Sequence, residues 1–132
     1  MTVVLDTSVL TAVVFGEPDA EALLATLRRH AGDLVISAAT AVELGIVVEA
    51  RQGVEATRDL QLLLDRLRVE VVPLDATQAA LAVAAWRRFG KGRHPAGLNL
   101  GDCFAYAAAR HHGGALFFKG GDFAQTDVRS LS

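Results

Sequence analysis

Val3-Val4-Leu5-Asp6-Thr7-Ser8, at residues 3–8, is a short apolar run that ends at an acid followed by two hydroxyl residues. A run without a polar position predicts a strand that is buried on both faces, the kind found in parallel sheets. Similar runs recur at 34–36, within 70–73 and at 115–118. We expect a strand at each of these places.

Longer segments of helical character separate these runs. We expect helices over 7–15, 19–30, 38–51, 54–67, 75–89 and 100–112, with Ser37, Asp75 and Asn99 as N-caps. Strands that alternate with helices predict a three-layer α/β domain with a mostly parallel sheet of four or five strands flanked by helices. The fifth strand would lie near Val128. A chain of 132 residues predicts a single domain over residues 1–132.

Composition narrows the class of protein. Apolar residues make up 52% and charged residues 21% of the chain, which excludes a disordered protein. The longest uncharged run, from Ala76 to Trp86, is shorter than the roughly 20 residues of a membrane span, and the N-terminus lacks the basic start of a signal peptide. The single cysteine, Cys103, excludes an internal disulfide and a multi-cysteine zinc site. We therefore expect a cytoplasmic protein without membrane contact.

Four acids occur beside apolar segments: Asp6, Glu43, Asp102 and Asp122. Asp6 and Asp122 follow the first and last expected strands, and the carboxyl ends of parallel strands meet at one edge of a sheet. Glu43 lies in the largely apolar segment 40–48, and Asp102 precedes an uncharged helical segment. Taken singly, each acid also fits a structural role at a turn, a helix start or a solvated helix face. Buried acids without a nearby Arg or Lys, however, need some other partner.

A divalent cation is the partner that this set of acids favours. Two carboxylates about 5 Å apart repel by roughly 3 kcal/mol in an effective dielectric near 20. A cation relieves this repulsion, and an all-oxygen ligand set favours Mg²⁺, or Mn²⁺, over zinc. With the hydroxyls of Thr7 and Ser8 beside the acids, the pattern favours metal-assisted attack of water on a phosphodiester.

The same residues resemble the PIN-domain ribonucleases, and most of all the VapC-type toxins of bacterial toxin–antitoxin systems. The resemblance rests on four segments in order, 3–8, 37–44, 98–103 and 117–123, and spans essentially the whole chain. It implies a PIN-like fold and four catalytic and metal-binding acids: Asp6, Glu43, Asp102 and Asp122. It also implies three supporting residues, namely Thr7, Ser8 and Asn99.

The resemblance implies an activity and partners as well. The implied activity is that of a Mg²⁺-dependent endoribonuclease toxin of a type II system, with Mn²⁺ as an alternative ion. Such an enzyme cleaves structured RNA, tRNA or rRNA, to 5′-phosphate and 3′-hydroxyl ends and inhibits translation. The implied protein partners are a VapB-like antitoxin and a second copy of the chain. These would form a homodimer, and a heterotetramer or larger assembly with the antitoxin.

Two positions depart from the family pattern. Lys119 stands where many PIN domains have a small hydroxyl residue, and Gly121 precedes the fourth acid where a polar residue is common. For this reason Asp127 stays open as an alternative to Asp122.

Basic residues before Asp102 are candidates for contacts with RNA phosphates, and a solvated loop is the alternative interpretation. These candidates are Arg87, Arg88, Lys91 and Arg93, with Lys119 as a fifth. We expect Trp86 in the core or in a dimer interface. The leucine faces of the helices over 19–30 and 54–67 predict either a groove for an antitoxin helix or ordinary core packing.

Two other functions were compared with the ribonuclease. A PIN-like RNA-binding module with weak catalysis would contain the same residues. A receiver-like signalling domain needs a pair of acids after the first strand, where Asp6 stands alone.

The formal net charge of −2 is unusual for a nucleic-acid-binding protein. Without the four site acids, however, 11 acids face 13 bases, so the remainder carries +2.

Overall fold

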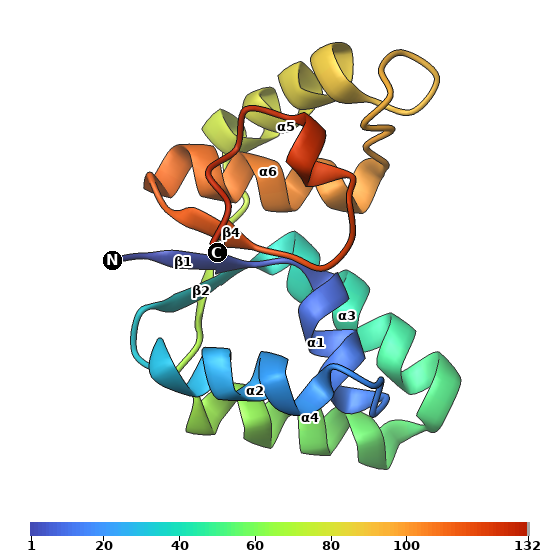
Figure 1. Cartoon of the computed structure of the whole chain (residues 1–132), viewed down its shortest axis with the longest axis vertical. Helices are drawn as coiled ribbons and strands as arrows, with labels where there is room; N and C mark the ends of the chain where they lie inside the picture. The colour runs from blue at the N-terminus through green and yellow to red at the C-terminus, as the bar shows by residue number, and fades with distance from the viewer. Residues whose placement is uncertain (132) are drawn as a thin grey trace.

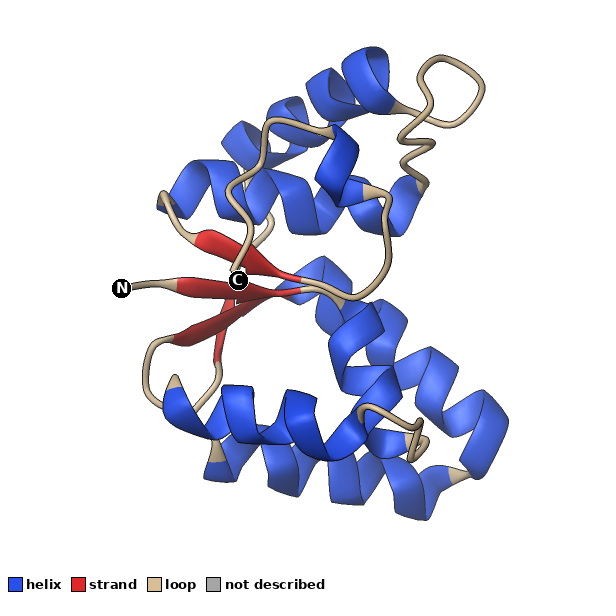
Figure 2. Cartoon of the chain, viewed as in Figure 1, coloured by secondary structure: helices blue, strands red, loops and turns tan. Residues whose placement is uncertain are grey.

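The computed structural model describes residues 1–131 and contains a four-stranded sheet. The sheet lies between layers of helices (Figures 1 and 2). The strands are β1 (Val3–Leu5), β2 (Leu34–Ser37), β3 (Glu70–Val72) and β4 (Ala115–Phe117). They lie in the order β3-β2-β1-β4, and every neighbouring pair is parallel. The expected strands and the α/β fold class are therefore confirmed.

The helices cover both faces of the sheet. They are α1 (Thr7–Val14), α2 (Ala20–Arg29), α3 (Ala38–Gln52), α4 (Val54–Arg66), α5 (Ala76–Phe89) and α6 (Leu100–His112), followed by the 3₁₀ turn η1 (Phe123–Gln125). Figure 1 shows α5 and α6 on one face of the sheet and α2 and α4 on the other.

Successive residues of the central strand pack into two separate cores. Val4 packs with Leu116 and with the buried residues of α5 and α6, whereas Val3 and Leu5 pack with those of α1 to α4. All three residues of β1 are fully buried. This two-sided burial is the reason that the first strand is apolar at every position.

The fifth strand that the sequence left open near Val128 does not form. The tail makes one isolated parallel bridge to β4, between Leu116 and Ser130. Two hydrogen bonds carry it, from Leu116 N to Arg129 O at 2.8 Å and from Leu131 N to Leu116 O at 3.0 Å. Because pairing stops after this bridge, the tail lies beside β4 without extending the sheet as a strand.

The expected N-caps are confirmed, and they determine where the helices begin. The side chains of Ser37, Asp75 and Asn99 each accept a hydrogen bond from a backbone N–H in the first turn of α3, α5 and α6. Asp6 does the same for α1. Since α1 and α3 start directly after β1 and β2, their first turns lie at the carboxyl ends of the strands, where α/β proteins bind ligands.

The structure buries the leucine faces of α2 and α4 but leaves Trp86 partly exposed. Leu27 of α2 and Leu60 and Leu64 of α4 are buried, so the leucine faces of these helices serve as core. Trp86 is not a core residue, because it is 45% exposed. No helix within residues 1–131 is both long and apolar enough to span a bilayer.

Candidate metal centre

Asp6 occupies the end of β1 and the N-cap of α1. Its backbone N–H donates to the carbonyl of Phe117 in β4 at 3.1 Å, and its Oδ2 accepts from the backbone N–H of Ser8 at 3.0 Å. The residue is only 6% exposed. Burial raises the pKa of Asp6, and the nearby charge of Glu43 adds to the rise, although the hydrogen bonds from Ser8 oppose it. The carboxylate is therefore kept in an environment that disfavours its charge.

Asp102 lies in the first turn of α6, within a capping box. Its backbone N–H donates to Asn99 Oδ1 at 2.9 Å, and its Oδ2 accepts from the backbone N–H of Asn99 at 3.0 Å. Burial raises the pKa of Asp102 to about 6, and the charges of Asp6, Asp122 and Glu43 add to the rise. The electrostatic coupling shows that the structure brings the four acids into one neighbourhood.

Glu43 reaches this neighbourhood from α3 and is held there by two close neighbours. The Thr7 hydroxyl donates to Glu43 Oε1 at 2.6 Å. On the other side, a Cβ added to Gly101 would lie 2.1 Å from Glu43 Oε2. Only glycine allows α6 to approach the carboxylate so closely. Sequence reasoning assigned no role to Gly101, although its place directly before Asp102 was the available signal.

Asp122 and Asp127 lie in different environments. Asp122 is exposed in the loop after β4, and its charge acts on Asp102. Asp127 pairs with Arg88 at 3.1 Å and Arg110 at 3.9 Å and accepts a hydrogen bond from the Tyr106 hydroxyl. The geometry therefore favours Asp122 over Asp127 as the fourth acid of the centre.

Two of the expected supporting residues, Asn99 and Ser8, accept hydrogen bonds from backbone N–H groups. Asn99 caps α6 as described, which fixes the turn that carries Asp102. The Ser8 hydroxyl accepts a hydrogen bond from the backbone N–H of Lys119 at 2.9 Å, so it joins the start of α1 to the loop after β4. Thr7, in contrast, contacts an acid of the centre directly.

The donor set fits a divalent cation chemically. In the part of the chain that the structure describes, no Lys, Arg or His forms an ion pair with Asp6, Glu43, Asp102 or Asp122. The side chains of Asp6, Glu43 and Asp102 accept hydrogen bonds from Ser8, Thr7 and Asn99, respectively. Within residues 1–131, no three possible ligands converge closely enough to hold one ion as they stand. Carboxylate oxygens that lack a positive partner are the kind of ligand that a hard divalent cation prefers.

The five basic candidates for RNA contact are not equally free. Arg88 pairs with Asp127. Arg93 stacks over the Trp86 ring at 4.7 Å and donates to the Arg87 carbonyl at 3.2 Å. Lys119 pairs with Glu17 and Asp19. Within the described residues, Arg87 and Lys91 have no ion pair, so these two are the basic side chains most readily available to an anion.

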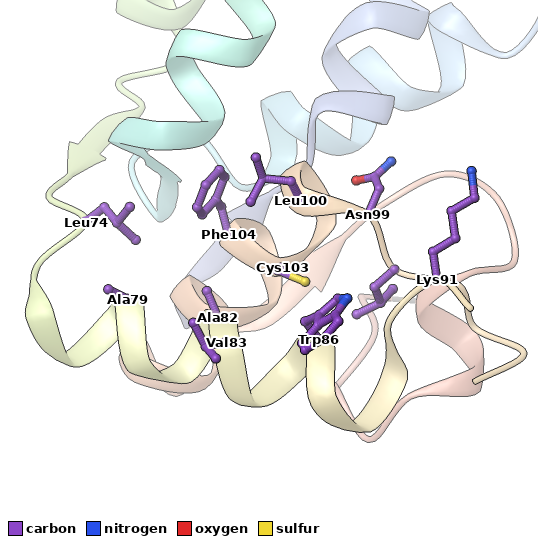
Figure 3. Close-up of a pocket in the computed structure, with 11 residues that line it drawn as sticks. Leu74, Ala79, Ala82, Val83, Trp86, Lys91, Asn99, Leu100, Cys103 and Phe104 are labelled. Atoms are coloured by element: carbon purple, nitrogen blue, oxygen red, sulfur yellow. The ribbon is translucent and has the colours of Figure 1, made fainter. Parts of the chain in front are cut away.

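An apolar cavity of about 560 Å³ lies beside the start of α6, between α5 and the loop that precedes α6. Figure 3 shows Val83 and Trp86 of α5 on one side of it, and Leu100, Cys103 and Phe104 of α6 on the other. Leu100 and Trp86 remain 73% and 45% exposed. Exposed apolar side chains gathered around a hollow are typical of a surface that binds another macromolecule.

Comparison with known proteins gives a consistent set of relatives. The model of the PIN domain family matches residues 3–129. The chain is 48% identical over 130 residues to a protein named Ribonuclease VapC from Mycolicibacterium smegmatis, covering 97% of this chain and 98% of that protein. It is 46% identical over 129 residues to Ribonuclease VapC30 from Mycobacterium tuberculosis, covering 98% of each.

Solved structures show the same fold at low sequence identity. Mycobacterium tuberculosis VapC20, described as a sarcin-ricin loop cleaving toxin, superposes with a TM-score of 0.81 at 16% identity and covers 98% of both chains. A chain of the DNA-bound VapBC complex from Salmonella typhimurium superposes with a TM-score of 0.77 at 18% identity, covering 100% of this chain and 97% of that one. The expected PIN-like architecture is thereby confirmed.

Proposed function

The chain belongs to the PIN domain family, among the VapC ribonucleases of toxin–antitoxin systems, and from this premise we propose that it is a Mg²⁺-dependent endoribonuclease that cleaves structured RNA. The proposed substrate is tRNA or rRNA, and the proposed consequence of its cleavage is inhibition of translation.

The observation that carries this proposal is the set of acids around the start of α6. Asp6 is buried and Asp102 is partly buried, and burial together with neighbouring acids raises the pKa of Asp102 to about 6. No positive side chain within residues 1–131 forms an ion pair with them. Helix capping by Asp6 and Asp102 does not require neighbouring unpaired carboxylates, which repel one another, so the arrangement favours a role in binding a cation.

Each acid has a distinct part in the proposed centre. Asp6 and Asp102 would be the main ligands of the ion, because the first turns of α1 and α6 fix their backbones. Glu43 would act directly or through water, oriented by the Thr7 hydroxyl. Asp122 would complete the site from the loop after β4. A bound divalent ion polarises a phosphoryl oxygen and lowers the pKa of an attacking water.

The reaction proposed is hydrolysis at phosphorus. The oxygen of water bonds to phosphorus as the water gives up a proton to solvent, the bond from phosphorus to the 3′ oxygen breaks, and the 3′ oxygen takes up a proton from solvent. The products carry a 5′-phosphate and a 3′-hydroxyl. Around this centre, Lys91 and Arg87 are the basic side chains available to bind the flanking phosphates of RNA.

We also propose the assembly that the family implies. The partners are a VapB-like antitoxin and a second copy of this chain, in a homodimer that becomes a heterotetramer or larger with the antitoxin. The apolar cavity rimmed by Trp86 and Leu100 supports association with another protein chain, since such side chains are costly to leave in water. The RNA substrate and the antitoxin would both be met in the cytoplasm.

The test is cleavage of total cellular RNA by the purified protein, followed by sequencing of the new 5′-phosphate ends. We expect cuts at a small number of sites in tRNA or rRNA, dependent on added Mg²⁺ or Mn²⁺ and abolished by a chelator. Binding of RNA without any cut in the presence of either ion would instead identify an RNA-binding module. Cleavage that persists in the chelator would contradict the metal centre.

A further inference from the structure

Lys119 occupies the first position after the apolar run of β4 and connects two distant parts of the chain. Its backbone N–H donates to Ser8 Oγ at 2.9 Å. Its ammonium group lies 2.5 Å from Glu17 Oε1 and 2.9 Å from Asp19 Oδ1. Glu17 and Asp19 belong to the turn between α1 and α2, so this ion-pair triad ties the loop after β4 to that turn.

The triad is a specific contact rather than a chance meeting of surface charges. The Lys119 side chain is 34% exposed and contacts two carboxylates at once. The hydrogen bonds to Glu17 and Asp19 raise the pKa of Lys119, and the hydrogen bond from Lys119 lowers the pKa of Asp19. Both directions agree with an ammonium group that stays charged between its two acids.

The loop between Lys119 and Phe123 has few other contacts to fix its shape. Gly120 adopts a φ of +101°, and nothing lies within 4 Å of the position of a Cβ at Gly120 or Gly121. At the far end of the loop, Phe123 is 3% exposed and packs against Phe118, with the two ring centroids 5.2 Å apart. Asp122 therefore sits on a glycine-containing loop that is held at both ends.

We infer that Lys119 is a positioning residue of the proposed metal centre. Its ion pairs with Glu17 and Asp19 fix the conformation of the loop that contains Asp122. The inference rests on the proposed function, because it concerns how the fourth acid reaches the ion. The same ion pairs keep the Lys119 ammonium group directed away from the acids of the proposed centre. Removing the lysine could therefore weaken metal binding, by freeing the loop, or strengthen it, by removing a competing charge, and these two results are distinguishable by experiment.

The test measures Mn²⁺ binding by calorimetry and amide hydrogen exchange in the metal-free protein, for the wild type, Lys119→Met, Lys119→Arg and the double variant Glu17→Gln/Asp19→Asn. We expect Lys119→Met to weaken Mn²⁺ binding by roughly three- to tenfold, the size of effect that a partly exposed ion pair can transmit. Exchange should accelerate at residues 119–123. The double variant should show the same changes, because it breaks the same contact from the other side.

Two further results are expected if the triad acts as one unit. Combining Lys119→Met with the double variant should add little to either single effect, since coupled residues are not additive. Lys119→Arg should retain most of the wild-type behaviour, because a guanidinium group can also bridge two carboxylates.

Either of two outcomes would overturn the inference. Tighter Mn²⁺ binding by Lys119→Met would mean that the lysine acts as a competing charge, and unchanged binding together with unchanged exchange would mean that the ion pairs hold nothing in place. Failure of the metal centre itself gives a different result: the wild type would not bind Mn²⁺, or Asp102→Asn would bind it equally well. In that case exchange in the metal-free protein still decides whether Lys119 orders the loop.

Discussion

Helix α6 contacts two groups of carboxylates that differ in their partners. Near its start, Asp102 is surrounded by other acids, and burial with their charges raises its pKa to about 6. Further along the helix, Tyr106 and Arg110 contact Asp127. Burial is the largest single influence on the pKa of Asp127 and raises it, but the Tyr106 hydrogen bond together with Arg88 and Arg110 lowers the pKa overall. The first carboxylate lacks a cation within the described residues, whereas the second has two.

The difference separates an acid with structural partners from the acids that we propose as metal ligands. Asp127 joins the C-terminal tail to α5 and α6 through partners that the chain itself supplies. The acids around Asp102 repel one another, and a bound cation would remove this repulsion. An acid that already forms ion pairs with Arg or Lys, as Asp127 does, is thus a poor candidate for a metal ligand, even when it follows the last strand as closely as Asp127 does.

The largest expected effect comes from neutralising the unpaired acids. Asp6→Asn and Asp102→Asn should each reduce RNA cleavage on the order of a thousandfold, because each removes a charged ligand of the ion. Both should stay folded, since asparagine also caps helices and removes a repelling charge. Initial cleavage rates on one mapped site, with circular dichroism of each variant, are the measurement.

A matched control is Asp33→Asn, which removes an exposed acid whose side chain pairs with the N-terminal amine at 3.9 Å. This variant should cleave like the wild type. Cleavage at the wild-type rate by both Asp6→Asn and Asp102→Asn would show that the proposed acids are not the active site.

A smaller loss is expected when Glu43 is displaced without changing any acid. Gly101→Ala places a methyl group where the Glu43 carboxylate lies, so the carboxylate must move. We expect cleavage to fall roughly tenfold while the free energy of unfolding changes by less than about 1 kcal/mol, because the side-chain end is flexible and alanine favours the helix. Cleavage assays and urea denaturation give the two quantities.

Gly45→Ala in α3 is the control for that substitution, because nothing lies within 4 Å of a Cβ at this position. It should leave cleavage unchanged and stabilise the protein slightly. Equal cleavage by Gly101→Ala and Gly45→Ala would contradict a role for the close approach of α6 to Glu43.

Stability should depend on pH through Asp102. Its pKa is raised from 3.8 to about 6 on folding, so the folded metal-free protein binds a proton in this range that the unfolded chain has released. The contribution of Asp102 to the free energy of unfolding should therefore fall as pH rises from about 4 to about 6, on the order of 1 kcal/mol after allowance for its partial exposure. Urea denaturation of metal-free wild type and Asp102→Asn across this range isolates the contribution.

Added Mg²⁺ should reverse this loss at pH 7, because a ligand that binds only the folded state stabilises it by mass action. Mg²⁺ should have little effect on the stability of Asp102→Asn. A wild type whose stability rises between pH 4 and 6 relative to Asp102→Asn would contradict the raised pKa.

The smallest effect is expected at the paired acid. Asp127→Asn keeps an acceptor for the Tyr106 hydroxyl but removes the charge that Arg88 and Arg110 share. The Asp127 side chain is 36% exposed, so the free energy of unfolding should fall by only about 0.5–1 kcal/mol. Cleavage should not change, and a loss comparable to that of Asp102→Asn would place Asp127 in the metal centre instead.

Much of the fold could be predicted from the sequence because local signals agreed with each other. The fully apolar runs predicted the strands, and Ser37, Asp75 and Asn99 marked three helix starts correctly. The option of a strand near Val128 failed because one bridge, and not a ladder, joins the tail to β4. The core position considered for Trp86 was wrong because hydrophobicity alone does not distinguish a core residue from the rim of an exposed cavity, whereas its place in a dimer interface stays a prediction.

The sequence alone was enough to select the four candidate acids, since their position after apolar strands and within apolar helices is visible in the order of residues. Their partners were decided only by the tertiary structure. Lys119 and Asp127 are close in the chain to Asp122, yet Lys119 binds acids about 100 residues away and Asp127 binds α5 and α6. A charge is neutralised by whatever lies within a few ångströms of it in space, and the linear order of residues does not contain that distance.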